Sequence, residues 1–245
     1  SAQQAASKFG FSFSGSDPQL IIDDPIINLV AILTRHHLHT PQILAALKAG
    51  KHVFCEKPLA ITAEELTEVA AFLSQPGNPM LMLGFNRRFA PLAVKLKAFL
   101  EGRSEPLVAH YRVNAGFLPK DHWTQDPVQG GGRIIGEGCH FIDFLSFLVG
   151  SNPITVRAQA LDDDGKYNQD NVILNFTYPD DSIGTVTYLA NGDKSYPKER
   201  IEVFCGGRVA VLDNFRTLEL ASHGHTKRFQ NKFAQDKGHQ AAWLA

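Results

Sequence analysis

The sequence predicts an α/β protein in which a parallel, doubly wound sheet is followed by a second α/β domain with a large, open, mostly antiparallel sheet. Two observations predict this class. Up to residue 102, short apolar runs alternate with helix signals, as in strand–helix–strand units. Beyond it, the runs are longer, alternate between polar and apolar residues and are separated by turn signals. We therefore expect two domains, residues 1–84 and residues 85–245.

The first domain is expected to contain three strands. Residues 1–9 predict the last part of a helix, with Gly10 as its C-terminal cap. Residues 28–33 (NLVAIL) form a run without polar alternation, which is typical of a strand covered on both faces. Residues 52–55 (HVFC) and 80–85 (MLMLGF) predict the other two strands.

Helices are expected between and after these strands. Thr40 as N-cap and Pro41 at the first helical position predict a helix that ends at Gly50. The capping-box pattern TAEE at residues 62–65 predicts the start of a second helix. A third helix is expected over residues 91–100.

The second domain is expected to pair its longer runs into a sheet. These runs occupy residues 107–117, 171–178, 182–190, 200–207 and 208–213. Turn signals at residues 179–181 (PDD) and 206–207 (GG) separate paired runs, and the polar stretch HGH at residues 223–225 predicts a surface turn. One helix, over residues 132–149, interrupts the sheet.

The composition is ordinary for a globular protein. The net charge is -1, which gives no support for nucleic acid or an anionic membrane as a partner. Hydrophobic residues make up 44% of the chain, but no apolar run approaches the length needed to span a bilayer. The three cysteines, Cys55, Cys139 and Cys205, are odd in number and widely spaced, so we expect reduced thiols in a cytoplasmic protein.

The sequence has no glycine-rich nucleotide loop. A doubly wound nucleotide domain should begin with a strand, a glycine-rich turn and a helix, but no GxGxxG occurs in these 245 residues. The chain begins inside a predicted helix and stops at QAAWLA, which predicts the start of another. We therefore expect a piece of a longer protein, without the first strand, glycine loop and first helix of its first domain and with an incomplete C-terminus.

Three histidines follow the first expected strand, in TRHHLH at residues 34–39. Open α/β sheets bind ligands at the carboxyl ends of their parallel strands. Histidine is the commonest metal ligand, but no nearby carboxylate or cysteine set completes a zinc-like spacing. The plain alternative is a polar loop that caps the next helix. We favour loop contacts to a nucleotide and expect no resident metal.

Glu56, Lys57 and Pro58 follow the second expected strand. They can form a surface ion pair of little energetic weight. However, a lysine at the mouth of a buried parallel sheet is partly desolvated, which makes it usable as an acid or base. The position directly after a strand makes Lys57 a candidate for proton transfer.

A glycine-rich helix carries the third candidate site. Glu137 and His140 are spaced i, i+3 and are expected to share a helix face, which Asp143 continues. These residues can be a satisfied network in the core. Glycines are frequent over residues 130–138, however, and because they are poor helix formers they suggest that something approaches this helix closely. We favour a catalytic histidine.

Three segments in this order resemble the glucose-fructose oxidoreductase / inositol dehydrogenase (Gfo/Idh/MocA) family. They are residues 28–62 (NLVAILTRHHLHTPQILAALKAGKHVFCEKPLAIT), 84–91 (GFNRRFAP) and 130–143 (GGGRIIGEGCHFID). Without the resemblance, Arg87 and Arg88 of the second segment are either a solvated face or a site for a phosphate or carboxylate.

The resemblance implies a two-domain enzyme. A Rossmann domain would bind NAD or NADP, and an α/β domain with an open sheet would bind a sugar, inositol, nucleotide sugar or related polyol. Hydride would pass between the carbinol and the nicotinamide. The resemblance also implies a homo-oligomer that pairs through the second-domain sheet. The motifs TRHHLH, NRRFAP, HYRVNAG and GGRIIGEGCHFID are also similar to those of family members in which this region follows a zinc-type alcohol dehydrogenase-like region in one polypeptide.

The resemblance assigns roles residue by residue. Lys57 matches the lysine of the family's EKP motif, which orients the substrate and moves the proton. His140 matches the active-site histidine, the usual general base. The positions that match the cofactor site are Thr34, Arg35, His36, His39, Glu56, Lys57 and Arg88.

The sequence departs from the family at Gly136, where an aspartate often precedes the histidine by four residues; Glu137 is expected to substitute for it in catalysis. We predict that Lys57 and His140 line one cleft between the domains. Two alternatives stay open. One is a non-catalytic binding or dimerisation fragment that has lost its cofactor loop, and the other is a metal-dependent lyase or hydrolase. The metal-dependent alternative would use His36, His39 and His140.

Overall fold

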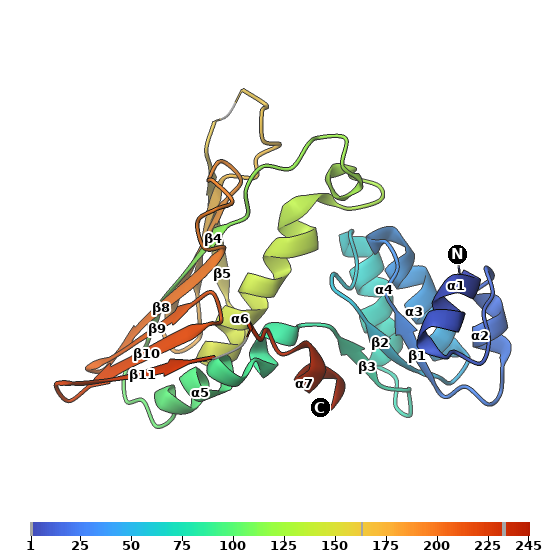
Figure 1. Cartoon of the computed structure of the whole chain (residues 1–245), viewed down its shortest axis with the longest axis horizontal. Coiled ribbons are helices and arrows are strands. Elements are labelled where there is room, and N and C mark those ends of the chain that lie inside the picture. Colours follow the sequence, from blue (N-terminus) through green and yellow to red (C-terminus); the bar gives the residue numbers. More distant parts are fainter. Residues whose placement is uncertain (1, 163, 232–233) are drawn as a thin grey trace. The chain divides into compact units, whose positions relative to one another are not determined.

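The computed structural model describes residues 2–162, 164–231 and 234–245. The chain forms two compact units, Ser1–Leu83 and Gly84–Ala245. In Figure 1 the first unit carries the labels α1 to α4 and β1 to β3, and the second unit carries the remaining labels.

The first unit contains a three-stranded sheet in the order β1-β2-β3. Its strands are β1 (Leu29–Ile32), β2 (His52–Cys55) and β3 (Leu81–Leu83). Its helices are α1 (Ala2–Phe9), α2 (Gln19–Asp23), the 3-10 helix η1 (His36–Leu38), α3 (His39–Lys48) and α4 (Ala63–Leu73). Both pairings are parallel, with Cys55 opposite Ile32 on one side and Leu83 on the other. The predicted parallel sheet is confirmed, and its strands end at one edge.

The predicted start of α4 is confirmed, whereas the predicted start of α3 is not. Helix α4 begins with the predicted capping box, in which the Glu65 amide donates to Thr62 Oγ1 at 3.2 Å. The predicted start of α3 is wrong by two residues, because its N-cap is Leu38 rather than Thr40. This helix begins at His39, directly after η1, so Thr40 lies inside it and its hydroxyl donates to the Leu59 carbonyl.

The prediction that β1 is covered on both faces is wrong for this chain. Leu29 is 50% exposed and Ala31 is also exposed, whereas Ile32 is buried. Side chains of a strand alternate between its two faces, and α3 packs against the face that carries Ile32. The core of the unit contains Ile32, Ile43, Leu44, Ala46, Leu47, Val53, Cys55 and Val69.

The second unit is built on an eight-stranded sheet in the order β11-β10-β9-β8-β4-β7-β6-β5. Its strands are β4 (Val108–Asn114), β5 (Thr155–Ala160), β6 (Val172–Thr177), β7 (Ile183–Leu189), β8 (Glu199–Cys205), β9 (Arg208–Asp213), β10 (Thr217–Ser222) and β11 (His225–Gln230). Its helical segments are η2 (Asn86–Phe89), α5 (Pro91–Leu100), η3 (Trp123–Gln125), η4 (Ile134–Gly138), α6 (Cys139–Val149) and α7 (His239–Trp243). Among the strands that the structure describes in this unit, only β4 and β7 form a parallel pair, so the predicted mostly antiparallel sheet is confirmed.

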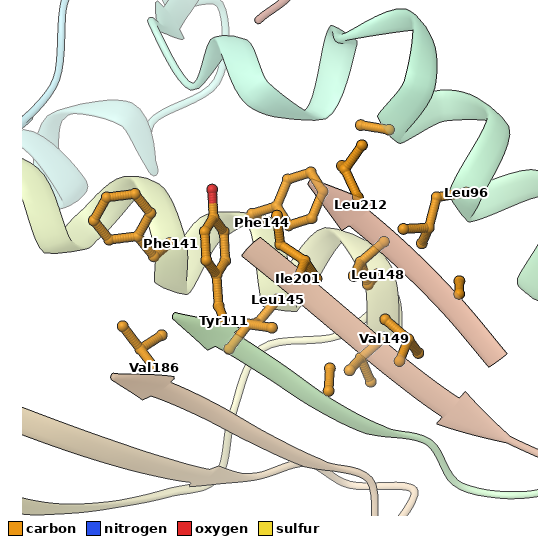
Figure 2. Close-up of a cluster of buried hydrophobic side chains, with 14 of the residues drawn as sticks. Leu96, Tyr111, Phe141, Phe144, Leu145, Leu148, Val149, Val186, Ile201 and Leu212 are labelled. Atoms are coloured by element: carbon orange, nitrogen blue, oxygen red, sulfur yellow. The ribbon is translucent and has the colours of Figure 1, made fainter. Parts of the chain in front are cut away.

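Helices α5 and α6 pack against one face of this sheet. Figure 2 shows the side chains buried there, with Tyr111 of β4 beside Phe141 and Phe144 of α6. The ring centroids of Tyr111 lie 4.9 Å and 5.6 Å from those two phenylalanines. Leu145 and Leu148 continue the same helix face, because apolar residues three and four positions apart form one stripe.

Three strands lie outside the predicted set, namely β5, β10 and β11. β5 and β11 are the two edges of the sheet, and most of their side chains are exposed on both faces, so they lack the alternation that marks a half-buried strand. The predicted turn at residues 206–207 joins β8 to β9, and its two glycines have φ of 50° and 74°. No helix in the described part of the chain has the length and apolar character that a membrane span requires.

Candidate active site

The carboxyl ends of β1 and β2 bring two predicted segments to one edge of the first unit's sheet. Thr34 and Arg35 follow β1 and are exposed, while Glu56 and Lys57 follow β2 and are half-buried. The Glu56 amide donates to the Ile32 carbonyl at 2.9 Å, so the pairing of the two strands continues to the start of this segment. Open α/β sheets bind their ligands at such an edge.

His39 connects these two segments. Its ring is fully buried, with Nδ1 2.7 Å from the carbonyl oxygen of Pro58 and Nε2 3.0 Å from that of Thr34. The Thr34 hydroxyl in turn donates to Gln42 at 3.0 Å. The imidazole therefore fixes the course of both strand-end segments, and its two nitrogens face the backbone of the protein.

His36 packs against His39 with the ring centroids 5.8 Å apart, and its side chain is buried. Among the residues that the structure describes, no group of three or more histidine, cysteine, aspartate or glutamate side chains is placed to hold a metal ion. The metal-dependent alternative therefore finds no ligand set in the described part of the chain.

Cys55, the last residue of β2, is a structural thiol. Burial, and secondly the charge of Glu56, raises the pKa of this thiol to about 12. A thiol is nucleophilic as its thiolate, and Cys55 stays protonated at neutral pH. At this end of β2, the candidates for chemistry are therefore the polar residues that follow the strand rather than Cys55.

The helix predicted over residues 132–149 consists of two kinds of helix. Ile134–Gly138 form a π-helix, η4, and the α-helix α6 continues from Cys139. A π-helix has i→i+5 hydrogen bonds and more residues in each turn than an α-helix. The expectation that Glu137 and His140 share an α-helical face through i, i+3 spacing is therefore corrected.

His140 lies in the first turn of α6 and is 7% exposed. The ring of Phe85 packs edge-on against it, with the centroids 6.1 Å apart. Burial and this aromatic contact therefore limit the movement of the His140 ring.

Glu137 is bound by three side chains from different parts of the second unit. Lys198 and Tyr188 donate hydrogen bonds to its carboxylate, and Arg133 Nη2 donates to its Oε2 at 3.3 Å. Burial alone would raise the pKa of Glu137, but the Lys198 ammonium, the two hydrogen bonds and the Arg133 charge lower it to about 2. The side chain is therefore held as a carboxylate at neutral pH. Burial and this carboxylate together raise the pKa of Tyr188.

Lys198 and Tyr188 are absent from the candidates that the sequence suggests. Lys198 directly precedes β8 and Tyr188 is the last but one residue of β7. Neither residue stands at a spacing from Glu137 that any known motif would predict. The sequence feature that could have found them is a polar residue close to the end of a predicted strand. The pairing of the strands decides which such ends come together.

Arg88 pairs with Asp143 within the second unit. It donates from Nε at 3.1 Å and also from Nη2, and 37% of its side chain stays exposed. Burial raises the pKa of Asp143 although Arg88 acts to lower it. The guanidinium lies 5.8 Å from the ring of Phe147. Contact between Arg88 and a cofactor stays a prediction.

Arg87, in contrast, is used inside the protein. It is buried and pairs with Glu199, which also accepts hydrogen bonds from Tyr111 and Lys237. Burial alone would raise the pKa of Glu199, but the charges and hydrogen bonds of Arg87 and Lys237 hold it well below its usual range. The sequence leaves Arg87 and Arg88 as either a solvated face or a site for an anion. A solvated face is excluded for Arg87, because its side chain is buried.

Two family models match this chain. A model described as an oxidoreductase family with an NAD-binding Rossmann fold matches residues 1–85. The model of the GFO/IDH/MocA C-terminal domain matches residues 102–208. The two models are the N-terminal and C-terminal domains of one family, in the order found in this chain.

Curated relatives include named dehydrogenases. Levoglucosan dehydrogenase of Pseudarthrobacter phenanthrenivorans is 36% identical over 160 residues, which cover 61% of this chain and 40% of that protein. Inositol 2-dehydrogenase 2 of Saccharopolyspora erythraea is 35% identical over 149 residues, which cover 59% of this chain and 42% of that protein. The matched part of the chain thus spans less than half the length of these two relatives.

Solved structures resemble nearly the whole chain. Levoglucosan dehydrogenase in complex with NADH and levoglucosan has a TM-score of 0.82 at 27% identity, and the match covers 97% of this chain and 70% of that one. The complex of levoglucosan dehydrogenase with NADH has a TM-score of 0.82 at 28% identity. Together with the two domain models, these similarities show that the chain belongs to the Gfo/Idh/MocA family of oxidoreductases.

Proposed function

We propose that this protein is an oxidoreductase that uses NAD or NADP to transfer hydride to or from a CH–OH group of a sugar, inositol, nucleotide sugar or similar polyol. The observation that carries the proposal is the position of Lys57. This residue is a half-buried lysine at the carboxyl end of a parallel strand, within the segment that the NAD-binding family model matches. The names of the levoglucosan and inositol dehydrogenase relatives support a polyol substrate.

The strand-end residues of the first unit fit a dinucleotide. Thr34 and Arg35 are exposed donors, and Glu56 offers carboxylate oxygens to the hydroxyls of a ribose. Leu33 is 63% exposed beside Thr34 and gives an apolar surface for a flat ring. When bound, the nicotinamide supplies or accepts the hydride.

Three further residues complete the proposed cofactor site. His36 and His39 shape the loop after β1 from inside the protein, because their rings pack together and His39 contacts the backbone of both strand-end segments. Arg88 is kept as a cofactor contact because more than a third of its side chain lies exposed outside its pair with Asp143.

Lys57 and His140 are proposed to handle the hydroxyl proton. His140 accepts this proton when the alcohol is oxidised and returns it in the reverse direction. The Lys57 ammonium orients the same oxygen and stabilises negative charge that develops on it. Glu137, which is held ionised, contributes a fixed negative charge. The arrangement requires Lys57 and His140 to line one cleft, which stays a prediction.

The alternative is a non-catalytic binding or dimerisation module. It stays open on the sequence alone because these 245 residues contain no GxGxxG loop, but the dehydrogenase relatives do not favour it. Such a loop cradles the pyrophosphate on backbone N–H groups at a helix N-terminus.

Calorimetric titration with NAD⁺ and with NADP⁺ separates the two proposals. The measurement compares the 245-residue chain with the full-length gene product, and the latter is then assayed for NADH or NADPH formation with myo-inositol and levoglucosan. The dehydrogenase proposal expects binding and turnover by the full-length protein. Binding without turnover of any polyol would favour the alternative, and tight binding by the 245-residue chain would contradict the loss of its cofactor site.

We also propose that two copies of the protein pair through the outer face of the eight-stranded sheet. Val108, Ile183 and Phe204 are 49%, 45% and 50% exposed. Val108 stands directly opposite Ile183 of β7 on one side and Phe204 of β8 on the other. Because Ala109 and Tyr111 point into the core, these three side chains form an apolar patch on the opposite face, which a second copy would cover.

A cytoplasmic location is proposed on the state of the thiols. Cys55, Cys139 and Cys205 are free cysteines, and reduced thiols are typical of cytosolic proteins. A zinc-type alcohol dehydrogenase-like region upstream stays a prediction, which the coding sequence before Ser1 would test.

A further inference from the structure

A cluster of charged side chains lies at the ends of three central strands of the second unit's sheet. β4 and β7 are parallel and β8 is antiparallel to β4, so the last residues of β4 and β7 lie beside the first residues of β8. Tyr188 lies near the end of β7, Lys198 directly precedes β8, and Arg133 Nη1 donates to the carbonyl of Gly116, just beyond β4, at 2.8 Å. Glu137 of η4 contacts all three side chains.

Lys198 is the most exposed of the charged residues around Glu137. Its side chain is 39% exposed, against 23% for Glu137 and 7% for Arg133. In the part of the chain that the structure describes, the ammonium donates one hydrogen bond, to Glu137 Oε1. An ammonium carries three N–H donors, so donors remain for a ligand. The carboxylate that fixes this ammonium is three residues from His140.

The balance of charge around Lys198 selects the chemistry of that ligand. Two cationic side chains, Arg133 and Lys198, are accompanied by two acidic ones, Glu137 and Asp170, the latter 4.0 Å from Arg133 Nη1. Together these four side chains carry no net charge, so the attraction that they exert on an anionic ligand is small. The neighbouring cations Arg87 and Lys237 are paired with the buried Glu199. A neutral hydroxyl oxygen needs a donor and brings no charge.

We propose that Lys198 donates a hydrogen bond to a hydroxyl oxygen of a neutral polyol bound where β4 and β7 end and β8 begins, and that Glu137 positions Lys198 for this contact. The inference rests on the proposed function and adds a specificity-determining residue to it. Glu137 then acts through Lys198, and its role in the reaction is to hold a donor rather than to move a proton.

Calorimetric titration of the full-length protein, saturated with NADH, tests the contact. The probes are myo-inositol and levoglucosan as neutral polyols and D-gluconate as an anionic one. Lys198→Met should bind the better neutral probe about tenfold more weakly, as expected for the loss of one charge-assisted hydrogen bond. Lys198→Arg, which keeps a cationic donor, should bind within about threefold of wild type. The matched control is Lys194→Met, an exposed lysine in the same loop, which should bind as wild type does.

Each outcome separates the inference from the function on which it rests. Unchanged polyol binding by Lys198→Met, with wild-type NADH binding, would overturn the contact and leave the dehydrogenase proposal standing. Preferred binding of gluconate by wild type, lost in Lys198→Met, would show an anion site and overturn the neutral-ligand part. Failure of the wild type to bind NADH and every polyol would overturn both proposals.

A double-mutant cycle tests the positioning role of Glu137. Glu137→Gln should weaken polyol binding and raise KM with little change in kcat, because the donor is misplaced while the proton acceptor is kept. Adding Lys198→Met to Glu137→Gln should cause no further loss, since both changes remove one interaction. Additive losses, or a fall in kcat at constant KM, would show that Glu137 acts independently of Lys198.

Discussion

Arg87 meets both carboxylate oxygens of Glu199, with Nε 2.8 Å from Oε2 and Nη2 3.0 Å from Oε1. Arg87 belongs to η2 and Glu199 is the fully buried first residue of β8. Lys237, just before α7, donates to the same carboxylate. One buried acid thus ties two segments that are far apart in the sequence to the sheet of the second unit.

Glu199→Gln should destabilise the second unit by about 3–5 kcal/mol, because it leaves two buried or partly buried cations without their counter-charge. Urea unfolding followed by circular dichroism measures the loss. Glu202→Gln is the matched control on the same strand, because its ion pair with Arg200 is more than one-third exposed and should contribute no more than about 1 kcal/mol. Equal effects of the two changes would contradict the buried-pair interpretation.

Gly238→Ala should disrupt the packing of α7 against η2. A Cβ at this position would lie 2.4 Å from the Ala90 nitrogen and 2.5 Å from the Asn86 carbonyl oxygen, and φ is +81°. Gly224→Ala is the control, because its φ of +74° carries the same backbone strain but nothing lies within 4 Å of the added methyl. We expect about 1–2 kcal/mol for the control and clearly more for Gly238→Ala in thermal unfolding. Similar values would show that the close approach relaxes freely.

Glu137→Gln should remove a pH-dependent part of the stability. The pKa of Glu137 is lowered from 4.5 to about 2 in the folded protein. A lowered folded-state pKa contributes stability above the unfolded value, here on the order of 3 kcal/mol, and this is lost as the pH falls through the folded value. The stability difference between wild type and variant should therefore be largest near neutral pH and shrink between about pH 4.5 and 2. Urea denaturation at a series of pH values checks this, and a constant difference would contradict it.

Lys57→Met and His140→Ala in the full-length protein should each lower kcat by about 100-fold or more, as expected when a proton-transfer group is removed. The assay follows NADH or NADPH formation with the best polyol, and circular dichroism establishes that the fold is intact. Near-normal turnover in either variant would remove that residue from the proposed catalytic pair.

Phe204→Glu should convert the protein to a monomer if copies pair through the outer face of the sheet, because it places a charge within the apolar patch, next to Val108. Light scattering coupled to size-exclusion chromatography measures the mass. Val94→Glu on α5 is the control, since this valine is also about half exposed but lies on the helix layer. A variant that keeps the wild-type mass would place the interface elsewhere.

The elements that could be predicted from the sequence are those whose formation depends on residues close to one another in the chain. The capping box at Thr62 and Glu65, the turn at Gly206 and Gly207, and the apolar runs of β2 and β3 depend on residues within a few positions of each other. The edge strands β5 and β11 are exposed on both faces, so they have no hydrophobic period to detect.

The partners in the candidate site could be predicted only in part. Lys57 follows a recognisable strand and His140 lies in a recognisable helix, so their positions could be foreseen from the sequence. Glu137 and Lys198 are 61 residues apart, and their contact depends on how β4, β7 and β8 pair. Arg87 and Glu199 are 112 residues apart, and no local pattern indicates which of two adjacent arginines will be buried.

Because Ile134–Gly138 form a π-helix, the site could be rearranged by changing the number of residues in this turn, without replacing any residue. Deleting one residue there would allow the turn to close as α-helix and would rotate the preceding residues by roughly 100° about the axis of α6. Deletion of Gly138 would therefore turn the Glu137 side chain away from Lys198, Tyr188 and Arg133 while every strand of the sheet stays in register. In this protein, the number of residues in one turn thus sets which side chains the acid meets.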